Sequence, residues 1–363
     1  MRMGGYNIQL RKTFLGDKRD YYRSTLLRRL FIVMCLVVAF ISFGVALTIG
    51  KFEISALDCY RVIWEHLTDN IQDPRVDNII WGTRVPVALY AILCGAVLSI
   101  GGAVMQSILR NPLADPYMMG ISSGASLGVS LCVIMGLSVI PGLAGSLSQV
   151  AMAFIFSLIP MAVILLFSLK RRVTPTKIIL IGVAVAYVFS ALTTILMITA
   201  DEESLADVYR WNVGSFALIG WEDIPIPFAF SIVGFVVLMS MHRKINVMMA
   251  GTNTAHSLGI DTHRTTIILM LVVSLMTAAV VSFCGTVGFI GLVGPHIARI
   301  FVGSESKYLL PASAAFGAAF LLIANSIASV AGSSGLPVGV VSAIIGCPVF
   351  LLVLIRMKKS AWS

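Results

Sequence analysis

The feature that most constrains this chain is the recurrence of nearly uncharged apolar runs of roughly 18 or more residues, the first of which runs from Leu30 to Gly50. A helix of about 20 such residues crosses a hydrocarbon layer about 30 Å thick. The 363 residues are 58% hydrophobic and 12% charged, whereas an ordinary soluble domain has about 25% charged residues. The mean hydropathy is +0.94. The sequence therefore predicts an all-α membrane protein, a polytopic helical bundle.

We predict ten transmembrane helices from these runs. They cover residues 29–50, 82–109, 117–137, 147–169, 176–199, 226–242, 264–284, 287–303, 308–331 and 337–356. The first run begins too late in the chain, and is too long, for a cleaved signal peptide. We expect 29–356 to be a single ten-span membrane domain between two short polar tails.

The basic residues predict the orientation. With the N-terminus inside, the inner segments hold all but five of the 26 Lys and Arg residues; the five outer ones are Lys51, Arg61, Arg75, Arg84 and Arg210. Cytoplasmic loops carry such an excess. We therefore expect a basic cytoplasmic tail at 1–28, a second cytoplasmic tail at 357–363 and a multi-pass position in a lipid membrane. The basic tail fits anionic lipid rather than nucleic acid.

Two outer segments mix Trp, Tyr and charge as interfacial helices do. They are Ser55–Asp69 and Glu202–Leu218. Either could anchor the protein at the membrane surface or form a lip at which a partner docks.

The stretch RNPLADPYMMGISSGASLG begins at Arg110 and interrupts the apolar pattern. Proline restricts the residue before it to extended conformations, so Asn111, Pro112, Asp115 and Pro116 predict a tight turn at the inner surface. Small residues at four-residue spacing let helices approach closely; here they are Gly120, Gly124 and Gly128. This ladder predicts either a tightly packed helix pair or a helix that lines a path.

A second unusual stretch, GTVGFIGLVGPHIARI, begins at Gly285. Glycine costs about 1 kcal/mol relative to alanine in a helix, so Gly288, Gly291 and Pro295 make an immediate straight helix improbable and place this backbone in the protein interior. His296 and Arg299 share a helix face, but nothing nearby in sequence offers a second metal ligand. The six cysteines share no CxxC spacing, so we expect neither a metal site nor a disulfide framework.

The polar inner segment Asn246–Thr265 is long enough for two short helices, Thr252–Leu258 and another after Asp261, separated by Gly259. It is either a surface loop or a platform for a cytoplasmic partner. The chain has no GxxxxGK[ST] loop for nucleotide and no HExxH or GxSxG motif. Intramembrane carboxylates are typical of proton-coupled carriers, and their absence from the predicted spans disfavours a carrier driven by an ion gradient.

Three motifs resemble the FecCD-type permeases, the membrane subunits of ABC importers for iron-siderophores, haem and cobalamin. They are RVPVALYAILCGAVLSIGGAVMQSILRNPLADPYMMGISSGASLG from Arg84, GTVGFIGLVGPHIARIFVG from Gly285, and LPVGVVSAIIGCPVFLLVL from Leu336 with Pro337. The resemblance runs from about residue 30 to 356. It implies a type II ABC importer permease that pairs with a second permease copy or a homologous permease.

The same resemblance implies the partners and the sites. Two ABC ATPase subunits would bind ATP and Mg from the cytoplasm, and this chain would bind no cofactor and catalyse no reaction. An extracytoplasmic binding protein would deliver the cargo, in a bacterial or archaeal cytoplasmic (inner) membrane. The resemblance places the cytoplasmic gate at Thr174, Pro175 and Thr176. It places ATPase coupling within 243–264, at Gly251, Thr252, Asn253, Thr254, Ala255, His256, Ser257, Leu258, Gly259 and Asp261.

The chain departs from the family pattern at its outer end. Arg84 matches the first of the arginines that receive Glu side chains from the binding protein, but Val87 stands at the second position, and Ala328 or Ser329 at the third. We expect Arg84 to dock the binding protein. Three explanations fit the two missing arginines: a heterodimeric partner carries them, docking uses Arg61, Arg75 or Arg210, or the binding protein has different lobes. The resemblance favours ferric siderophore as the cargo, with cobalamin or haem as alternatives.

Overall fold

The computed structural model describes residues 4–50, 52, 54–139, 145–170, 174–332 and 335–356, and these ranges contain helices and no strand. Ten helices correspond one to one to the predicted spans: α1 Gly4–Thr48, α4 Val85–Leu109, α5 Ile121–Met135, α6 Ser146–Lys170, α7 Pro175–Ile198, α9 Pro225–Ser240, α12 Thr262–Cys284, α13 Ile290–Val302, α14 Ser306–Val330 and α15 Val338–Arg356. The prediction of an all-α polytopic bundle is confirmed.

Seven helical stretches in the described chain are long and apolar enough to cross a membrane. The other three apolar helices are shorter: α5, α13 and the 338–353 part of α15. The predicted ten spans are therefore present as helices, but they are not all full-length. The remaining elements are short: α2 Ala56–Leu67, α3 Pro74–Asp77, η1 Asn78–Arg84, η2 Pro116–Met119, α8 Glu202–Asn212, η3 Trp221–Asp223, α10 His242–Met249 and α11 Thr252–Ser257.

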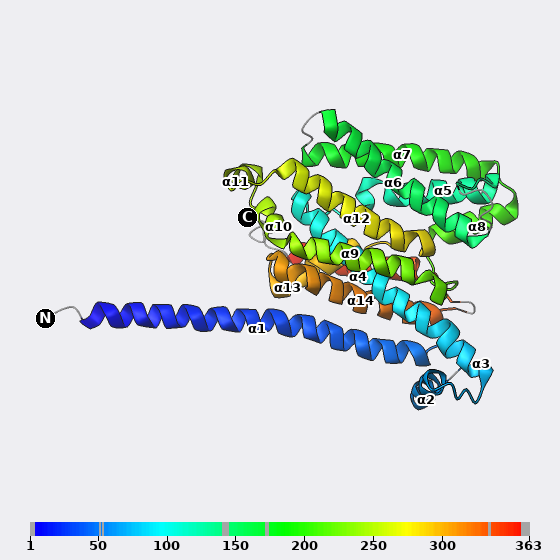
Figure 1. Cartoon of the computed structure of the whole chain (residues 1–363), viewed down its shortest axis with the longest axis horizontal. Helices are drawn as coiled ribbons and strands as arrows, with labels where there is room; N and C mark the ends of the chain where they lie inside the picture. Colours follow the sequence, from blue (N-terminus) through cyan, green and yellow to red (C-terminus); the bar gives the residue numbers. More distant parts are fainter. Residues whose placement is uncertain are drawn as a thin grey trace.

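The two ends of the bundle carry different elements (Figure 1). Helices α10 and α11 lie at one end, which we call the inner end, and α2, α3 and α8 lie at the opposite, outer end. Helices α2 and α8 fall within the two outer segments predicted to be structured. Helix α1 extends well beyond the inner end, because the predicted basic tail is helical from Gly4 onward. The predicted tail at 357–363 lies outside the described residues.

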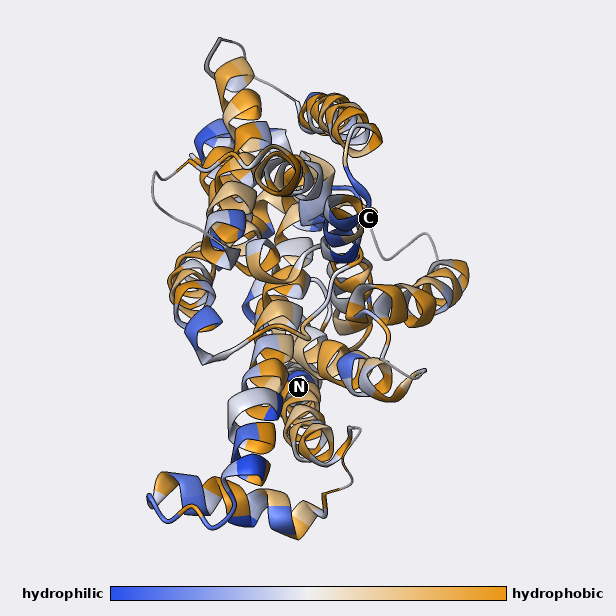
Figure 2. Ribbon diagram, turned by 90° about the vertical axis from the view of Figure 1, so that its right-hand side faces the viewer, coloured by the Kyte–Doolittle hydropathy of each residue, from blue (hydrophilic) through white to orange (hydrophobic). Residues whose placement is uncertain are grey.

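Helices α4, α12 and α14 form the centre of the bundle. In their most apolar windows, 72%, 67% and 56% of the residues are buried, compared with 22%, 17% and 22% in α1, α7 and α9. Hydrophobic residues also dominate the outward sides of the peripheral helices when the bundle is viewed along its length (Figure 2). This arrangement suits a bundle whose outer surface meets lipid or another membrane subunit rather than water.

The centre is held together by close backbone approaches at glycines. Gly95 of α4 lies against Gly317 of α14, and Gly102 of α4 lies against Gly291 of α13. Gly124 and Gly128 of α5 lie against the backbone of α6, so the predicted tight helix pair is present. Lipid gives no hydrophobic drive to bring helices together, so contact between backbones is a main source of their attraction.

We expect Gly128→Val to destabilise the α5–α6 pair by about 1–3 kcal/mol, because a Cβ at Gly128 would meet backbone atoms of Met152. The measurement is the thermal unfolding midpoint of the purified protein. Ala229→Val is the matched control, since Ala229 lies on an exposed face of α9. Equal midpoints for the two variants would contradict this role of Gly128.

Candidate functional site

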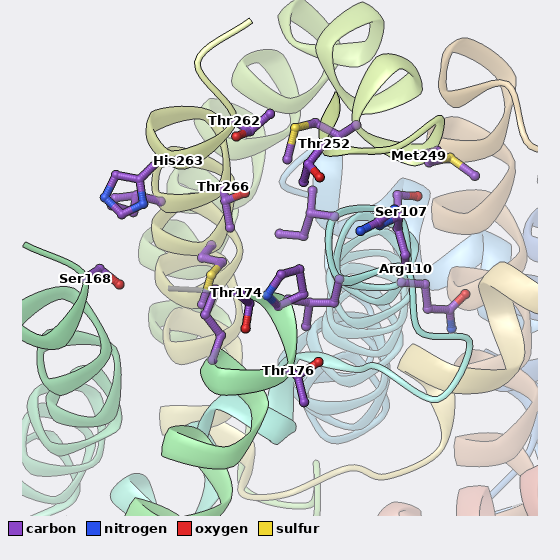
Figure 3. Close-up of a pocket in the computed structure, with 18 of the residues that line it drawn as sticks. Ser107, Arg110, Ser168, Thr174, Thr176, Met249, Thr252, Thr262, His263 and Thr266 are labelled. Atoms are coloured by element: carbon purple, nitrogen blue, oxygen red, sulfur yellow. The ribbon is translucent and has the colours of Figure 1, made fainter. Parts of the chain in front are cut away.

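A cavity of about 1240 Å³ opens at the inner end of the bundle. Side chains reach it from the end of α4, from α6, from the start of α7 and from the α10–α12 region (Figure 3). The predicted gate residues Thr174, Pro175 and Thr176 all line it. Thr252, Asn253 and His256 of the predicted coupling segment line it too. Tertiary structure thus brings together two predicted sites that are about 75 residues apart in the chain.

Thr174 is fixed by its place at the start of α7. Its backbone is extended, with φ −74° and ψ 156°, and its hydroxyl accepts a hydrogen bond from the backbone N–H of Lys177 at 3.4 Å. Pro175 follows at the first helical position. A backbone N–H there would have no partner within the helix, so its absence in proline costs no hydrogen bond. The predicted gate residues therefore form a helix N-terminus whose orientation is set by its own cap.

The coupling segment folds as predicted into a short helix, α11, and its residues point two ways. Ala255 is fully buried, and His256 Nε2 lies 3.2 Å from the hydroxyl of Thr262, the first residue of α12. The opposite side is exposed to solvent and carries Thr254, Ser257 and Leu258, with Leu258 64% exposed. One face of α11 is therefore tied to the bundle, and the other is free to meet a partner.

Positive-φ glycines bound this helix on both sides, Gly251 at φ 115° and Gly259 at φ 74°. Asp261 then caps α12, because its carboxylate accepts a hydrogen bond from the backbone N–H of Arg264 at 3.0 Å. That bond lowers the pKa of Asp261. Helix α10, which precedes α11, was not predicted from the sequence.

The segment after α4 turns at the predicted residues, because the N–H of Ala114 donates to the carbonyl oxygen of Asn111 at 3.1 Å. Arg110 turns the chain with φ 48°, but the chain then runs back into the bundle. A Cβ at Gly101 would lie 3.0 Å from Pro116 Cγ, and Gly101 is eight residues, or about 12 Å, from the end of α4. Likewise a Cβ at Gly120 would lie 3.2 Å from Pro160, which is about 15 Å from the end of α6.

Local hydrogen bonds shape this re-entrant segment. Asn111 Oδ1 accepts from the N–H of Leu113 at 3.0 Å, and Asp115 Oδ1 accepts from the N–H of Met118 at 3.0 Å. The carboxylate of Asp115 therefore lies at membrane depth, although no predicted span contains it. Asp115 lies between the second and third predicted spans, so sequence reasoning assigned it to the surface.

The residues before α13 are the second break in helical structure. Residues 285–288 are not helical, and Phe289 takes the left-handed conformation at φ 68° before α13 begins. Gly291 packs against the re-entrant segment, since a Cβ there would lie 3.1 Å from Pro116 Cδ. Pro295 lies inside α13, at the sixth residue of the helix, where a proline removes one intrahelical hydrogen bond. The expected absence of a straight helix from Gly285 is confirmed.

A buried polar cluster joins α4 to α13 beside the cavity. Arg299 Nη1 donates to Gln106 Oε1 at 3.3 Å, and Gln106 Nε2 lies 3.3 Å from His296 Nδ1, which also lies 2.8 Å from the carbonyl oxygen of Leu292. Gln106 is fully buried and also borders the cavity. Sequence reasoning missed it, because a single Gln in an apolar run has no partner until the fold supplies Arg299.

Neither this cluster nor any other described part of the chain groups three or more His, Cys, Asp or Glu side chains in a way that could hold a metal ion.

Pro337 marks the start of α15, where its carbonyl oxygen accepts from the N–H of Val340 at 3.1 Å.

At the outer end, Arg84 is engaged within the chain. It ends the π-helical segment η1, and its guanidinium donates to the carbonyl oxygens of Leu47 at 2.6 Å and Phe52 at 2.7 Å. Cys59 Sγ donates to the same Leu47 oxygen at 3.3 Å. Arg84 thus caps the C-terminal end of α1, where the last carbonyls of a helix otherwise lack partners.

Comparisons with known proteins agree with this architecture. The sequence model of the FecCD transport family matches residues 35–356. An ABC transporter permease protein of Methanocaldococcus jannaschii is 37% identical over 91% of this chain and 95% of its own length. The cobalamin import system permease protein BtuC of Halobacterium salinarum is 38% identical over 77% of this chain and 74% of its own length.

A solved structure is also similar. It is described as an inward-facing conformation of a metal-chelate type ABC transporter, and it superposes with a TM-score of 0.79 at 27% identity. The match covers 90% of this chain and 99% of the other.

We expect Arg84→Met to loosen the outer end of the molecule even when no binding protein is present. Loss of the two hydrogen bonds from a charged donor should cost about 1.5–3 kcal/mol, so amide hydrogen exchange in the last turn of α1 and in α2 should accelerate at least tenfold. Arg75→Met, at an exposed position of the same end, should leave the exchange unchanged. Unchanged exchange in Arg84→Met together with weaker capture of the binding protein would instead favour the docking role.

Proposed function

The chain belongs to the FecCD transport family, and on that premise we propose that it is the membrane-spanning permease subunit of an ABC importer for a metal chelate. The observation that carries this proposal is the inner cavity. The gate at Thr174–Thr176 and the coupling helix α11 border one space, so a movement of α11 reaches the gate without an intermediate domain.

The partners follow from the two faces of α11. We propose that an ATPase subunit docks on the exposed side, at Thr254, Ser257 and Leu258. A second permease, either another copy or a homologue, would complete the assembly with its own ATPase. An external binding protein would present the cargo at the outer end, where α2 and α8 lie. In this orientation the inner end faces the cytoplasm.

The transport cycle then needs no covalent chemistry from this chain. ATP and Mg would be bound and ATP hydrolysed in the partner subunits, which move α11 when they close. The contact of His256 with Thr262 passes that movement to α12, whose residues Thr262, His263 and Thr266 line the cavity. The start of α7 lies across the same cavity (Figure 3), so a shift of α12 changes the space at the gate.

The cargo that we propose is a ferric siderophore. The cavity walls offer mainly hydroxyl, thioether and apolar side chains, which suit passage of a bulky chelate without tight binding. Cobalamin is the first alternative, supported by the relative named for cobalamin import, and haem is the second. In this proposal the binding protein selects the cargo, and the permease provides a path that does not bind the cargo tightly.

The coupling role can be tested with two exposed leucines at opposite ends. We expect Leu258→Asp to reduce co-purification of the ATPase at least tenfold, because it places a charge on the exposed apolar side of α11. Leu218→Asp is the matched control, since Leu218 is 97% exposed at the outer end. Normal recovery of the ATPase with Leu258→Asp, and with residues 252–261 replaced by a Gly/Ser linker, would refute the assignment.

The cargo can be tested in proteoliposomes that contain the complete transporter with its binding protein. We expect ATP-dependent uptake of a radiolabelled ferric siderophore that exceeds uptake of cobalamin and haem, and that an ionophore does not affect. Preferential uptake of cobalamin or haem would replace the proposed cargo but keep the mechanism. Uptake by this chain alone, abolished by an ionophore, would show a carrier driven by an ion gradient instead.

A further inference from the structure

Helix α2, at the outer end, has three distinct faces. Its buried face packs on the bundle through Cys59 and Val62. Charged residues occupy another face, where Arg61 pairs with Asp58 at 3.0 Å and with Glu65 at 3.5 Å. The third face is apolar but exposed, and its members follow one another at intervals of three or four residues, as one side of a helix does. We call these four residues the α2 stripe: Leu57, 82% exposed, Tyr60, 51%, Trp64, 68%, and Leu67, 64%.

Tyr60 shows which way the α2 stripe faces. Its hydroxyl lies against Gly44 of α1, since a Cβ at Gly44 would lie 2.6 Å from that oxygen. Gly44 precedes the end of α1 at Thr48 by four residues, or about 6 Å. The α2 stripe therefore turns toward the layer that α1 crosses, and not away from it toward the outside.

The α2 stripe continues an exposed side of α1. The residues three, four and seven positions before Gly44 share its helix face. They are Ile41, Phe40 and Val37, and each is at least half exposed. An apolar surface thus runs along α1 and bends at Tyr60 onto α2. An exposed apolar surface of this extent on a membrane-spanning helix meets either lipid or another membrane subunit.

The shape of this corner favours lipid. Helix α2 lies below the end of α1 in Figure 1, and in Figure 2, which looks onto the outer end, it runs across the lower edge of the molecule. It forms a ledge over the exposed side of α1, and no other helix of the described chain lies beneath it. A second bundle packed along α1 would collide with this ledge, whereas fluid lipid chains fill the space under it. Tyr and Trp beside Leu are also typical of helices at the boundary between headgroups and acyl chains.

We infer that α2 is an interfacial anchor, with the α2 stripe inserted into the lipid leaflet at the outer end. The helix axis lies along the membrane surface, and Arg61 points to the aqueous side. The inference needs neither an ATPase nor a cargo, so it goes beyond the proposed function. Cys59 Sγ and the guanidinium of Arg84 both donate to the carbonyl oxygen of Leu47. Lipid that holds α2 in place therefore also holds the corner that Arg84 closes.

The test is electron paramagnetic resonance of a nitroxide label in vesicles of phosphatidylcholine and phosphatidylglycerol. The label is attached to the full chain at single cysteines introduced by Leu57→Cys or Trp64→Cys. The background carries Cys132→Ala and Cys347→Ala, because the other four native cysteines are buried. Arg61→Cys is the matched control, since it lies between the two positions on the charged face of the same helix. Collisions with oxygen, which dissolves in acyl chains, and with a water-soluble nickel chelate report the depth of the label.

We expect the labels at positions 57 and 64 to lie about 5–10 Å below the lipid headgroups and to collide with oxygen more than with the chelate. The label at position 61 should show the reverse. Equal access of the chelate to all three labels would mean that the α2 stripe faces water. Protection of positions 57 and 64 from both reagents would mean that protein covers the stripe. Either result overturns the inference.

A second measurement needs no label. Trp64→Phe should reduce the quenching of tryptophan fluorescence by lipids that are brominated close to the headgroup, because it removes the tryptophan of the α2 stripe. Trp221→Phe is the matched control, since Trp221 is 37% exposed and packs against Trp81 with ring centroids 4.9 Å apart. We expect the loss of quenching to be larger in Trp64→Phe than in Trp221→Phe. Quenching that Trp64→Phe leaves unchanged would contradict insertion.

Discussion

Hydrogen bonding of the backbone within a medium that offers no water governs this structure. A helix satisfies its own backbone, and most of the chain is helical for that reason. The informative places are those where helices stop at membrane depth, before α5 and before α13. There the chain satisfies itself by other means: Asp115 caps η2, and the hydroxyl of Tyr117 serves both the N–H and the carbonyl of Val287. The Asp115 cap is local, whereas the Tyr117 hydrogen bonds form only because the two non-helical segments lie side by side.

Glycine makes that adjacency possible. Gly101 and Gly102 on α4 accept Pro116 and Gly291 against the helix backbone, where a larger residue would hold the two segments apart. The tight packing also explains why α5 and α13 are short. Each begins where the chain has already crossed part of the membrane in a non-helical form, so about 22 Å of helix in α5 and about 20 Å in α13 suffice, compared with a hydrocarbon layer of about 30 Å.

The same junction separates the two functional ends of the molecule. Toward the inner end, α4 and α13 continue side by side, joined by Gln106 and Arg299, down to the cavity that the proposed gate and α11 share. Toward the outer end, α1, α2 and η1 form a small apolar core of their own around Leu47, Cys59 and Val62, and Arg84 closes it. Through its hydrogen bonds to Leu47 and Phe52, Arg84 has a structural role within this chain.

The sequence by itself determined the class of protein, the number of apolar helices, the two outer helices and the position of α11. Each of these depends on local composition: apolar length decides a span, and Gly251, Gly259 and Asp261 bound a short polar helix. The family motifs added the gate and the coupling segment as separate stretches. Only tertiary structure decided that Pro116 lies in the membrane rather than on its surface, because proline ends a helix but does not say which way the chain then goes. Contacts between distant residues settled that direction. Gly101 and Gly291 leave room for the returning chain, and Tyr117 finds in Val287 a partner 170 residues away.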